Sequence, residues 1–149
     1  MKNNLESTLQ EILQKNIDAE RGYRKAAENA DSDGLKTFFE DKSRDRKIFN
    51  DYLKQEILLN FENLKEEGSF TGTLHRTWMD LKSVFSKNSD AAMLEEAIRG
   101  DKSAVEEYEE ILKNTELPPK IADIIRTQLV NIKIDLNEVK SLEDLKKTI

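Results

Sequence analysis

Four carboxylates interrupt the apolar stripes of this sequence, at positions where helical spacing calls for hydrophobic side chains: Glu20, Asp45, Asp101 and Asp135. Counting apolar residues by threes and fours places them on the inward faces of their helical segments, with Arg46 as the alternative to Asp45 at its position. Inward carboxylates from several helices are the ligands of di-iron and di-manganese centres in helical bundles. The four residues are therefore the candidate metal ligands, and one divalent cation, iron or manganese, is the cofactor that they would take.

Two cations fall in the same layer as these carboxylates. Helical rise places Lys42 level with Glu20, and Arg46 follows Lys42 one turn later on the same face. A buried cation repels a divalent metal, and a buried charge needs a partner of opposite sign. We therefore expect an ion-pair and hydrogen-bond network in which the two cations neutralise Glu20, Asp45 and Asp101.

The available ligands weigh against a catalytic metal centre. The usual di-metal site of a helical bundle takes a Glu-x-x-His motif from each of two helices. This sequence has no such motif, and its one histidine is His75. We expect a non-enzymatic protein with no catalytic residue and no cofactor. Setting the four carboxylates against the two cations still leaves about two negative charges, so a carboxylate site for one metal ion stays open as the alternative.

Neutral polar residues also lie on the inward stripes. Helical rise places Asn16 level with Arg46. Tyr23, Tyr52 and Tyr108 stand at stripe positions as well, and a buried tyrosine usually donates a hydrogen bond to a neighbouring group. We expect these tyrosines to be structural.

Long stretches rich in Glu, Lys, Leu and Ala, separated by Gly and Pro, predict an all-α protein. Ser32 or Asp33 caps the second helix, and Pro118 with Pro119 begins the fourth. The second helix carries Leu59 on its apolar stripe. The chain forms a single domain over residues 1–149, with helices at about 3–30, 33–66, 89–114 and 119–146.

The connections between these helices predict the topology. The first and second helices, and the third and fourth, are joined by a few residues, so each pair should form an antiparallel hairpin. Residues 67–88 are longer than a usual helix–helix loop, and we expect a short helix within them at 73–85. A connection of this length can return along the bundle and leave the second and third helices parallel. One such long crossover is the topology of the ferritin-like four-helix bundle.

Several segments resemble a bacterial protein family: Asp18–Ala27, Gly68–Lys82, Leu94–Asp101 with Tyr108, and Leu117–Pro119. That family is catalogued only as a domain of unknown function, a four-helix bundle placed in the ferritin-like superfamily. The resemblance spans nearly the whole chain, and it implies the ferritin-like fold without an established activity. Members of the family often carry a histidine late in the fourth helix. This chain has none near Leu136, which weakens any inherited metal role.

Composition excludes several classes of protein. The 149 residues include no cysteine and carry a net charge of -6. The lack of cysteine excludes a disulfide framework and a thiol nucleophile, and the acidic balance argues against a nucleic-acid partner. No apolar run approaches the roughly 18–20 residues of a membrane span. The first residues lack the apolar core of a signal peptide, so we expect a cytoplasmic protein.

Two kinds of non-enzymatic role stay open. One is a binding or structural role, with a link to stress suggested only by the resemblance to ferritin-like proteins. The other is a partner-binding bundle that uses a helix face or the acidic run at residues 106–110. The partners are unknown, and a homo-oligomer formed through a helix face is among the expectations.

Overall fold

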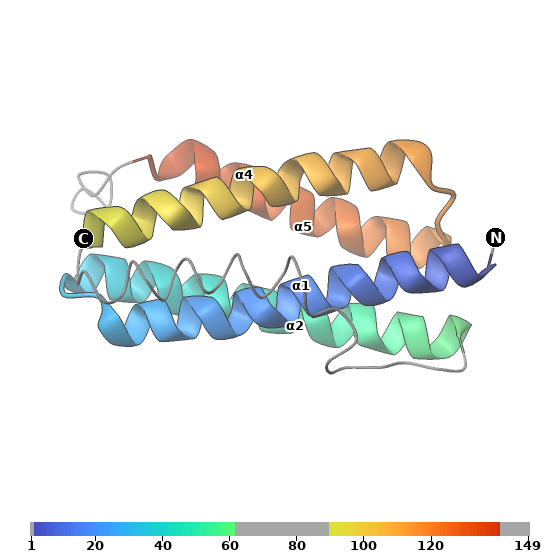
Figure 1. Cartoon of the computed structure of the whole chain (residues 1–149), viewed down its shortest axis with the longest axis horizontal. Helices are drawn as coiled ribbons and strands as arrows, with labels where there is room; N and C mark the ends of the chain where they lie inside the picture. The colour runs from blue at the N-terminus through green and yellow to red at the C-terminus, as the bar shows by residue number, and fades with distance from the viewer. Residues whose placement is uncertain (1, 62–89, 141–149) are drawn as a thin grey trace.

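The structure, a computed structural model, describes residues 2–61 and 90–140 (Figure 1). These residues fold into α-helices and contain no strand, so the all-α class is confirmed for this part of the chain. None of its helices is long and apolar enough to cross a membrane. The four helices are α1 (Lys2–Asn29), α2 (Asp33–Asn60), α4 (Asp90–Asn114) and α5 (Pro119–Glu138).

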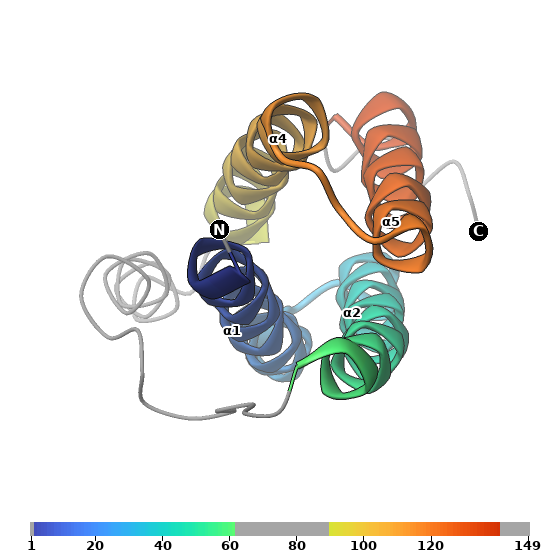
Figure 2. The same ribbon diagram turned by 90° about the vertical axis from the view of Figure 1, so that its right-hand side faces the viewer.

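The helices pack as two antiparallel hairpins, α1 with α2 and α4 with α5 (Figure 1). Viewed along the bundle, they stand at the corners of a square in which α2 lies beside α5 (Figure 2). The start of α4 lies at the α1–α2 turn, because the Asp90 carboxylate accepts hydrogen bonds from the backbone N–H groups of Asp31 and Ser32, at 2.8 and 2.9 Å. α2 and α4 therefore run in the same direction (Figure 1).

The connection from α2 to α4 lies outside the described residues. The crossover expected at 67–88 and its short helix at 73–85 therefore stay predictions. The placed helices show only that the end of α2 and the start of α4 lie at opposite ends of the bundle (Figure 1).

The helix boundaries follow from local chemistry at each end. Ser32 is the N-cap of α2, and its hydroxyl accepts a hydrogen bond from the backbone N–H of Leu35 at 3.2 Å. Pro119 occupies the first turn of α5, where the missing N–H leaves no hydrogen bond unmade.

Two helices end earlier than expected. α2 ends at Asn60 rather than at 66, and α5 ends at Glu138 rather than at 146. In each case the next residue is extended: Phe61 packs onto the core, and Val139 is buried within it. Each of these two helices is therefore followed by an extended hydrophobic residue that packs against the core.

Buried side chains form two hydrophobic clusters, one toward each end of the bundle. The alanine-rich cluster lies near the α1–α2 turn, and it leaves room for the rings of Tyr23 and Phe39 to stack at a centroid distance of 6.1 Å. Its members are Ala19, Tyr23, Ala26, Ala27, Ala30, Leu35, Phe39, Met93, Leu94, Ala97 and Val139. The aliphatic cluster fills the other half with Leu9, Ile12, Leu13, Phe49, Leu53, Ile57, Tyr108, Ile121, Ile125, Leu129 and Ile132.

Candidate functional site: the mid-bundle polar layer

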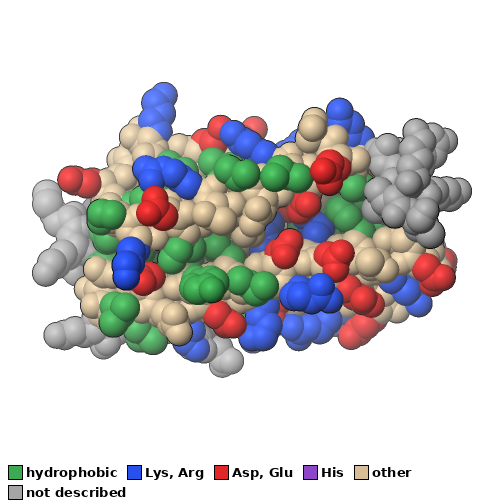
Figure 3. Space-filling view, turned by 180° about the vertical axis from the view of Figure 1, so that it is seen from behind, with side chains coloured by type: hydrophobic (Ala, Val, Ile, Leu, Met, Phe, Trp, Pro, Cys, Tyr) green, Lys and Arg blue, Asp and Glu red, His purple; other side chains and the backbone are tan. Residues whose placement is uncertain are grey.

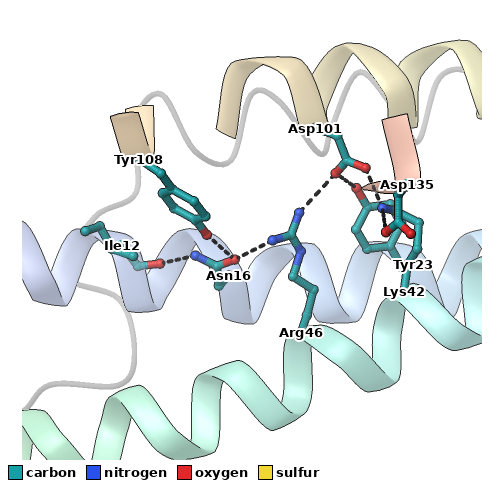
Figure 4. Close-up of polar contacts among 8 residues, drawn as sticks. All are labelled: Ile12, Asn16, Tyr23, Lys42, Arg46, Asp101, Tyr108 and Asp135. Atoms are coloured by element: carbon teal, nitrogen blue, oxygen red, sulfur yellow. Dashed lines mark hydrogen bonds and ion pairs between the residues drawn. The ribbon is translucent and has the colours of Figure 1, made fainter. Parts of the chain in front are cut away.

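Asp101 of α4 is the centre of the polar layer between the two clusters (Figure 4). Its side chain is 3% exposed, and both carboxylate oxygens accept hydrogen bonds from other helices. Oδ1 accepts from the Tyr23 hydroxyl at 2.6 Å and from Arg46 Nη2 at 3.0 Å. Oδ2 accepts from the Lys42 ammonium group. Two cations and a phenol therefore surround one carboxylate.

Asn16 continues this network toward the aliphatic cluster (Figure 4). Its Oδ1 accepts from Arg46 Nη1 at 3.0 Å and from the Tyr108 hydroxyl at 2.8 Å. Its Nδ2 donates to the backbone carbonyl of Ile12 at 2.8 Å. Asn16 was expected only to lie level with Arg46. The two are hydrogen-bonded, and the side chains join α1, α2 and α4.

Lys42 carries the network to the fourth helix. Its ammonium group lies 3.2 Å from Asp135 Oδ2 on α5 as well as against Asp101. It also lies 5.1 Å from the centroid of the Tyr23 ring and 5.4 Å from that of Phe38, within cation–π range. The Lys42 side chain is 4% exposed and that of Asp135 is 31% exposed. Asp135 is thus the partly hydrated edge of the layer.

Glu20 belongs to a separate, smaller set of contacts. Its Oε2 accepts from Arg24 one turn along α1 at 2.8 Å, and its Oε1 accepts from Asn50 Nδ2 of α2 at 3.2 Å. Glu20 was expected to be neutralised by Lys42 or Arg46, but both cations form ion pairs with Asp101 instead. Asp101 is the deeper carboxylate, so its ionised form depends more strongly on cations.

Asp45 was expected on the inward face of α2 but is exposed. Partial desolvation of its carboxyl group and the negative charge of Asp135 raise its pKa, while the charge of Lys42 offsets part of that effect. Asp45 was expected to be paired with Lys42 or Arg46, but the ion pairs of these two cations within residues 2–61 and 90–140 go to Asp101 and Asp135. The four predicted ligands therefore do not converge on one point.

Burial fixes the protonation states of the phenols and the guanidinium. Desolvation, reinforced by Asp101, raises the pKa of Tyr23 well above its usual value. Desolvation also raises the pKa of Tyr108 to about 12. Burial alone would lower the pKa of Arg46, but the oxygens of Tyr108, Tyr23 and Asp101 outweigh it and raise the pKa. Both tyrosines therefore remain donors and Arg46 remains a cation at any physiological pH.

These side chains do not fit a di-metal centre. A metal at Asp101 would have to displace the ammonium group of Lys42 and the guanidinium of Arg46, both buried with their charges. Across the part of the chain that the structure describes, no three Asp, Glu or His side chains are grouped closely enough to hold a metal ion. The arrangement can neutralise buried charge and fix the helices relative to one another.

Sequence reasoning missed two participants. Asn50 is 5% exposed, and one of its amide atoms, Oδ1, has no hydrogen-bond partner. Its spacing of four residues from Arg46 and three from Leu53 places it on the inward face of α2, which is the signal that could have identified it. Ser43 was also missed: its hydroxyl donates to the backbone carbonyl of Glu20 at 2.9 Å.

Comparisons with known proteins give a family without an activity. Residues 4–114, well over half of the chain, match the model of a domain of unknown function, DUF2383. No curated protein and no solved structure matches this chain. The resemblance inferred from the sequence motifs is thereby confirmed at the level of a domain of unknown function. The chain belongs to the DUF2383 family.

Proposed function

We propose that this chain is a non-enzymatic, ferritin-like four-helix bundle of the cytoplasm with a binding or structural role. In this proposal an internal ion-pair layer stands where related folds hold a metal centre. One observation carries it: both oxygens of Asp101 are occupied by Lys42, Arg46 and Tyr23. A metal ion bound at this carboxylate would have to displace two buried cations and a phenol.

The ferritin-like part of the proposal is supported by the directions of the helices. α1 with α2 and α4 with α5 form hairpins, and α2 runs parallel to α4 (Figure 1). Parallel second and third long helices require a connection that returns along the bundle, which is the feature of ferritin-like folds. The proposed crossover occupies residues 67–88.

The structural role of the layer follows from how its members are paired. Each buried charge has its partner on another helix: Lys42 and Arg46 on α2 and Asp101 on α4. Sliding one helix by a turn, about 5.4 Å, would separate these charges in the interior. An unpaired buried charge costs several kcal/mol, so the layer selects one register among those that hydrophobic packing alone would accept.

The competing function is binding of iron or manganese by the predicted carboxylates. Thermal unfolding distinguishes the two. The protein is melted in chelator and then with Fe(II), Mn(II) or Zn(II). An ion present at about a hundred times its Kd would stabilise the fold by roughly 2.7 kcal/mol, a rise in Tm of roughly 5–10 °C. We expect no rise with any of the three ions.

The matched variant for this experiment is Glu20→Ala. Glu20 is a predicted ligand whose oxygens contact only a polar amide and a surface arginine in the described structure. A rise in Tm that Glu20→Ala or Asp135→Ala abolishes would contradict the proposal and establish a metal site. A rise that survives both substitutions would place the ion elsewhere.

A further inference from the structure

A groove of about 420 Å³ lies between α2 and α5, next to the polar layer. Ile48, Phe49 and Tyr52 of α2 form one wall, and Ile124 of α5 contributes to the other. Phe49 is buried in the aliphatic cluster, so the floor of the groove is continuous with the core. Thr127, Gln128 and Asn131 of α5 also line the groove, so its surface is mostly apolar but more polar on α5 than on α2.

Large hydrophobic side chains are exposed at and around the groove. Ile48 is 49% and Tyr52 59% exposed, and Leu59, two turns further along the same face of α2, is 77% exposed. Tyr52 and Leu59 were expected to face the core and instead face outward. Figure 3 shows hydrophobic side chains gathered over α2 and α5, in the half of the bundle away from the α1–α2 turn. Contiguous exposed apolar surface of this kind marks interaction sites.

The charged residues that line the groove are both acidic, Asp45 and Asp123. Asp45 lies near Asp135, whose negative charge contributes to raising the pKa of the Asp45 carboxyl. Asp123 pairs with Arg126 at 3.1 Å, but the two side chains are 76% and 61% exposed, so water weakens this pair. A basic group brought by a partner would meet negative charge at both positions, offset only in part by Lys42 and Arg46 at Asp45 and by Arg126 at Asp123.

The two aspartates stand at opposite ends of the groove. α2 and α5 are antiparallel (Figure 1), and the Lys42–Asp135 contact fixes their register. Counting from that contact places Asp45 and Asp123 about nine residues of helical rise apart, roughly 13 Å. A helix lying in the groove could reach both aspartates with two side chains about two turns apart. Lysine and arginine are long and flexible enough to cover the remaining distance.

We infer that the α2–α5 groove binds the apolar face of a basic amphipathic helix, whose Lys or Arg side chains meet Asp45 and Asp123. A helix laid in a hydrophobic groove supplies apolar residues three and four apart. A second copy of this chain fits less well, because a symmetric contact would bring acidic grooves together in a protein of net charge -6. This inference names the partner class for the proposed binding role and does not depend on whether the polar layer binds metal.

Binding of a synthetic peptide to the full chain tests this inference. The probe is a labelled helical peptide of about 18 residues, long enough to hold helix on binding, with leucines three and four apart and two flanking lysines about two turns apart. Its control carries glutamates in place of the two lysines. At low salt, fluorescence anisotropy should give the lysine peptide a Kd about tenfold or more below that of the glutamate peptide.

Two protein variants and a matched control sharpen the result. Asp45→Lys should weaken binding of the lysine peptide about tenfold and improve that of the glutamate peptide. Tyr52→Ser should weaken both peptides, because it removes a wall of the groove. Asp51→Lys makes the same charge change on α2 at a residue that does not line the groove, and it should alter either Kd by about twofold at most.

Several outcomes would overturn the inference. One is equal binding of the two peptides or no binding of either, and another is an equal effect of Asp45→Lys and Asp51→Lys. If sedimentation shows that the wild type is a dimer and Tyr52→Ser a monomer, the groove binds a second copy of this chain. A large fall in Tm of the monomer on Tyr52→Ser would assign it to another segment of this chain. None of these results bears on the metal experiment, so the two proposals fail separately.

Discussion

The polar layer and the α2–α5 groove both contain acidic residues beside aromatic rings, but these acids differ in their burial and in how far nearby cations neutralise them. In the layer, Asp101 is enclosed by Lys42, Arg46 and Tyr23. In the groove, Asp45 faces solvent beside another negative charge. Lys42 and Asp45 are three residues apart on α2, so less than one helical turn separates an interior whose charges are paired from a surface whose acids are only partly neutralised. The first is built for stability and the second is open to a partner.

The largest expected effect comes from removing the centre of the layer. Asp101→Leu leaves Lys42 and Arg46 buried without their shared carboxylate, and we expect a loss of about 3–5 kcal/mol in the free energy of unfolding. Urea denaturation of the variant and the wild type measures the difference. The control is Asp41→Asn, whose surface ion pair with Arg44 is exposed; it should change stability by less than about 0.5 kcal/mol. Similar losses of unfolding free energy in both variants would contradict the claim that the buried ion pairs matter more for stability than the surface ones.

The two phenols should differ, because one donates to a charged acceptor and the other to a neutral one. Tyr23→Phe removes a hydrogen bond to the Asp101 carboxylate, with an expected cost of about 1.5–3 kcal/mol. Tyr108→Phe removes a hydrogen bond to the Asn16 amide, and its expected cost is about 1 kcal/mol. Chemical denaturation of both variants gives the comparison. A larger loss for Tyr108→Phe would mean that the strongest part of the network is not at Asp101.

Double-mutant cycles can compare two possible partners of Lys42: Asp135, which it contacts in the structure, and Glu20, with which the sequence placed it level. Lys42→Met combined with Asp135→Ala should show a coupling energy of about 1 kcal/mol, since the pair is direct but partly hydrated. Lys42→Met combined with Glu20→Ala should be additive within about 0.5 kcal/mol. Coupling of Lys42 to Glu20 instead would restore the pairing expected from the sequence.

Asp45 should produce the smallest effect, and it depends on pH. A carboxyl whose pKa is raised on folding favours the native state while it is protonated, and this contribution is lost as the pH rises through the folded-state pKa. Asp45→Asn should therefore be slightly more stable than the wild type at neutral pH. The difference should vanish in acid, below the pKa of the unfolded chain. Thermal melts of both proteins across the acidic range would show this convergence, and a constant difference at all pH values would refute it.

The sequence predicted the parts of the fold that depend on periodicity. Spacing by threes and fours identified the all-α class, the short α1–α2 and α4–α5 turns, and the inward positions of Lys42, Arg46 and Asp101. These features follow from a single helix at a time, because the residues on one face of a helix are set by its own rotation per residue.

The sequence could not predict which charges would meet. Glu20 and Lys42 are level, yet Lys42 reaches across to Asp101 and Asp135, because the rotation of each helix against its neighbours decides the partner. The same rotation turns Tyr52 and Leu59 outward, although their types suit a core. Asn50 was missed for a related reason: its contact with Glu20 exists only once α1 and α2 are packed.

Replacing the whole charged centre tests the account most directly. The triple variant Lys42→Met, Arg46→Leu and Asp101→Leu removes the charges together, and its free energy of unfolding is compared with that of Asp101→Leu alone. If the three charges serve to neutralise one another, the triple variant should lie within about 1–2 kcal/mol of the wild type or above it, well recovered from the loss of the single variant. A triple variant as unstable as Asp101→Leu, or less stable, would show that these residues are not each other's partners and would contradict the account.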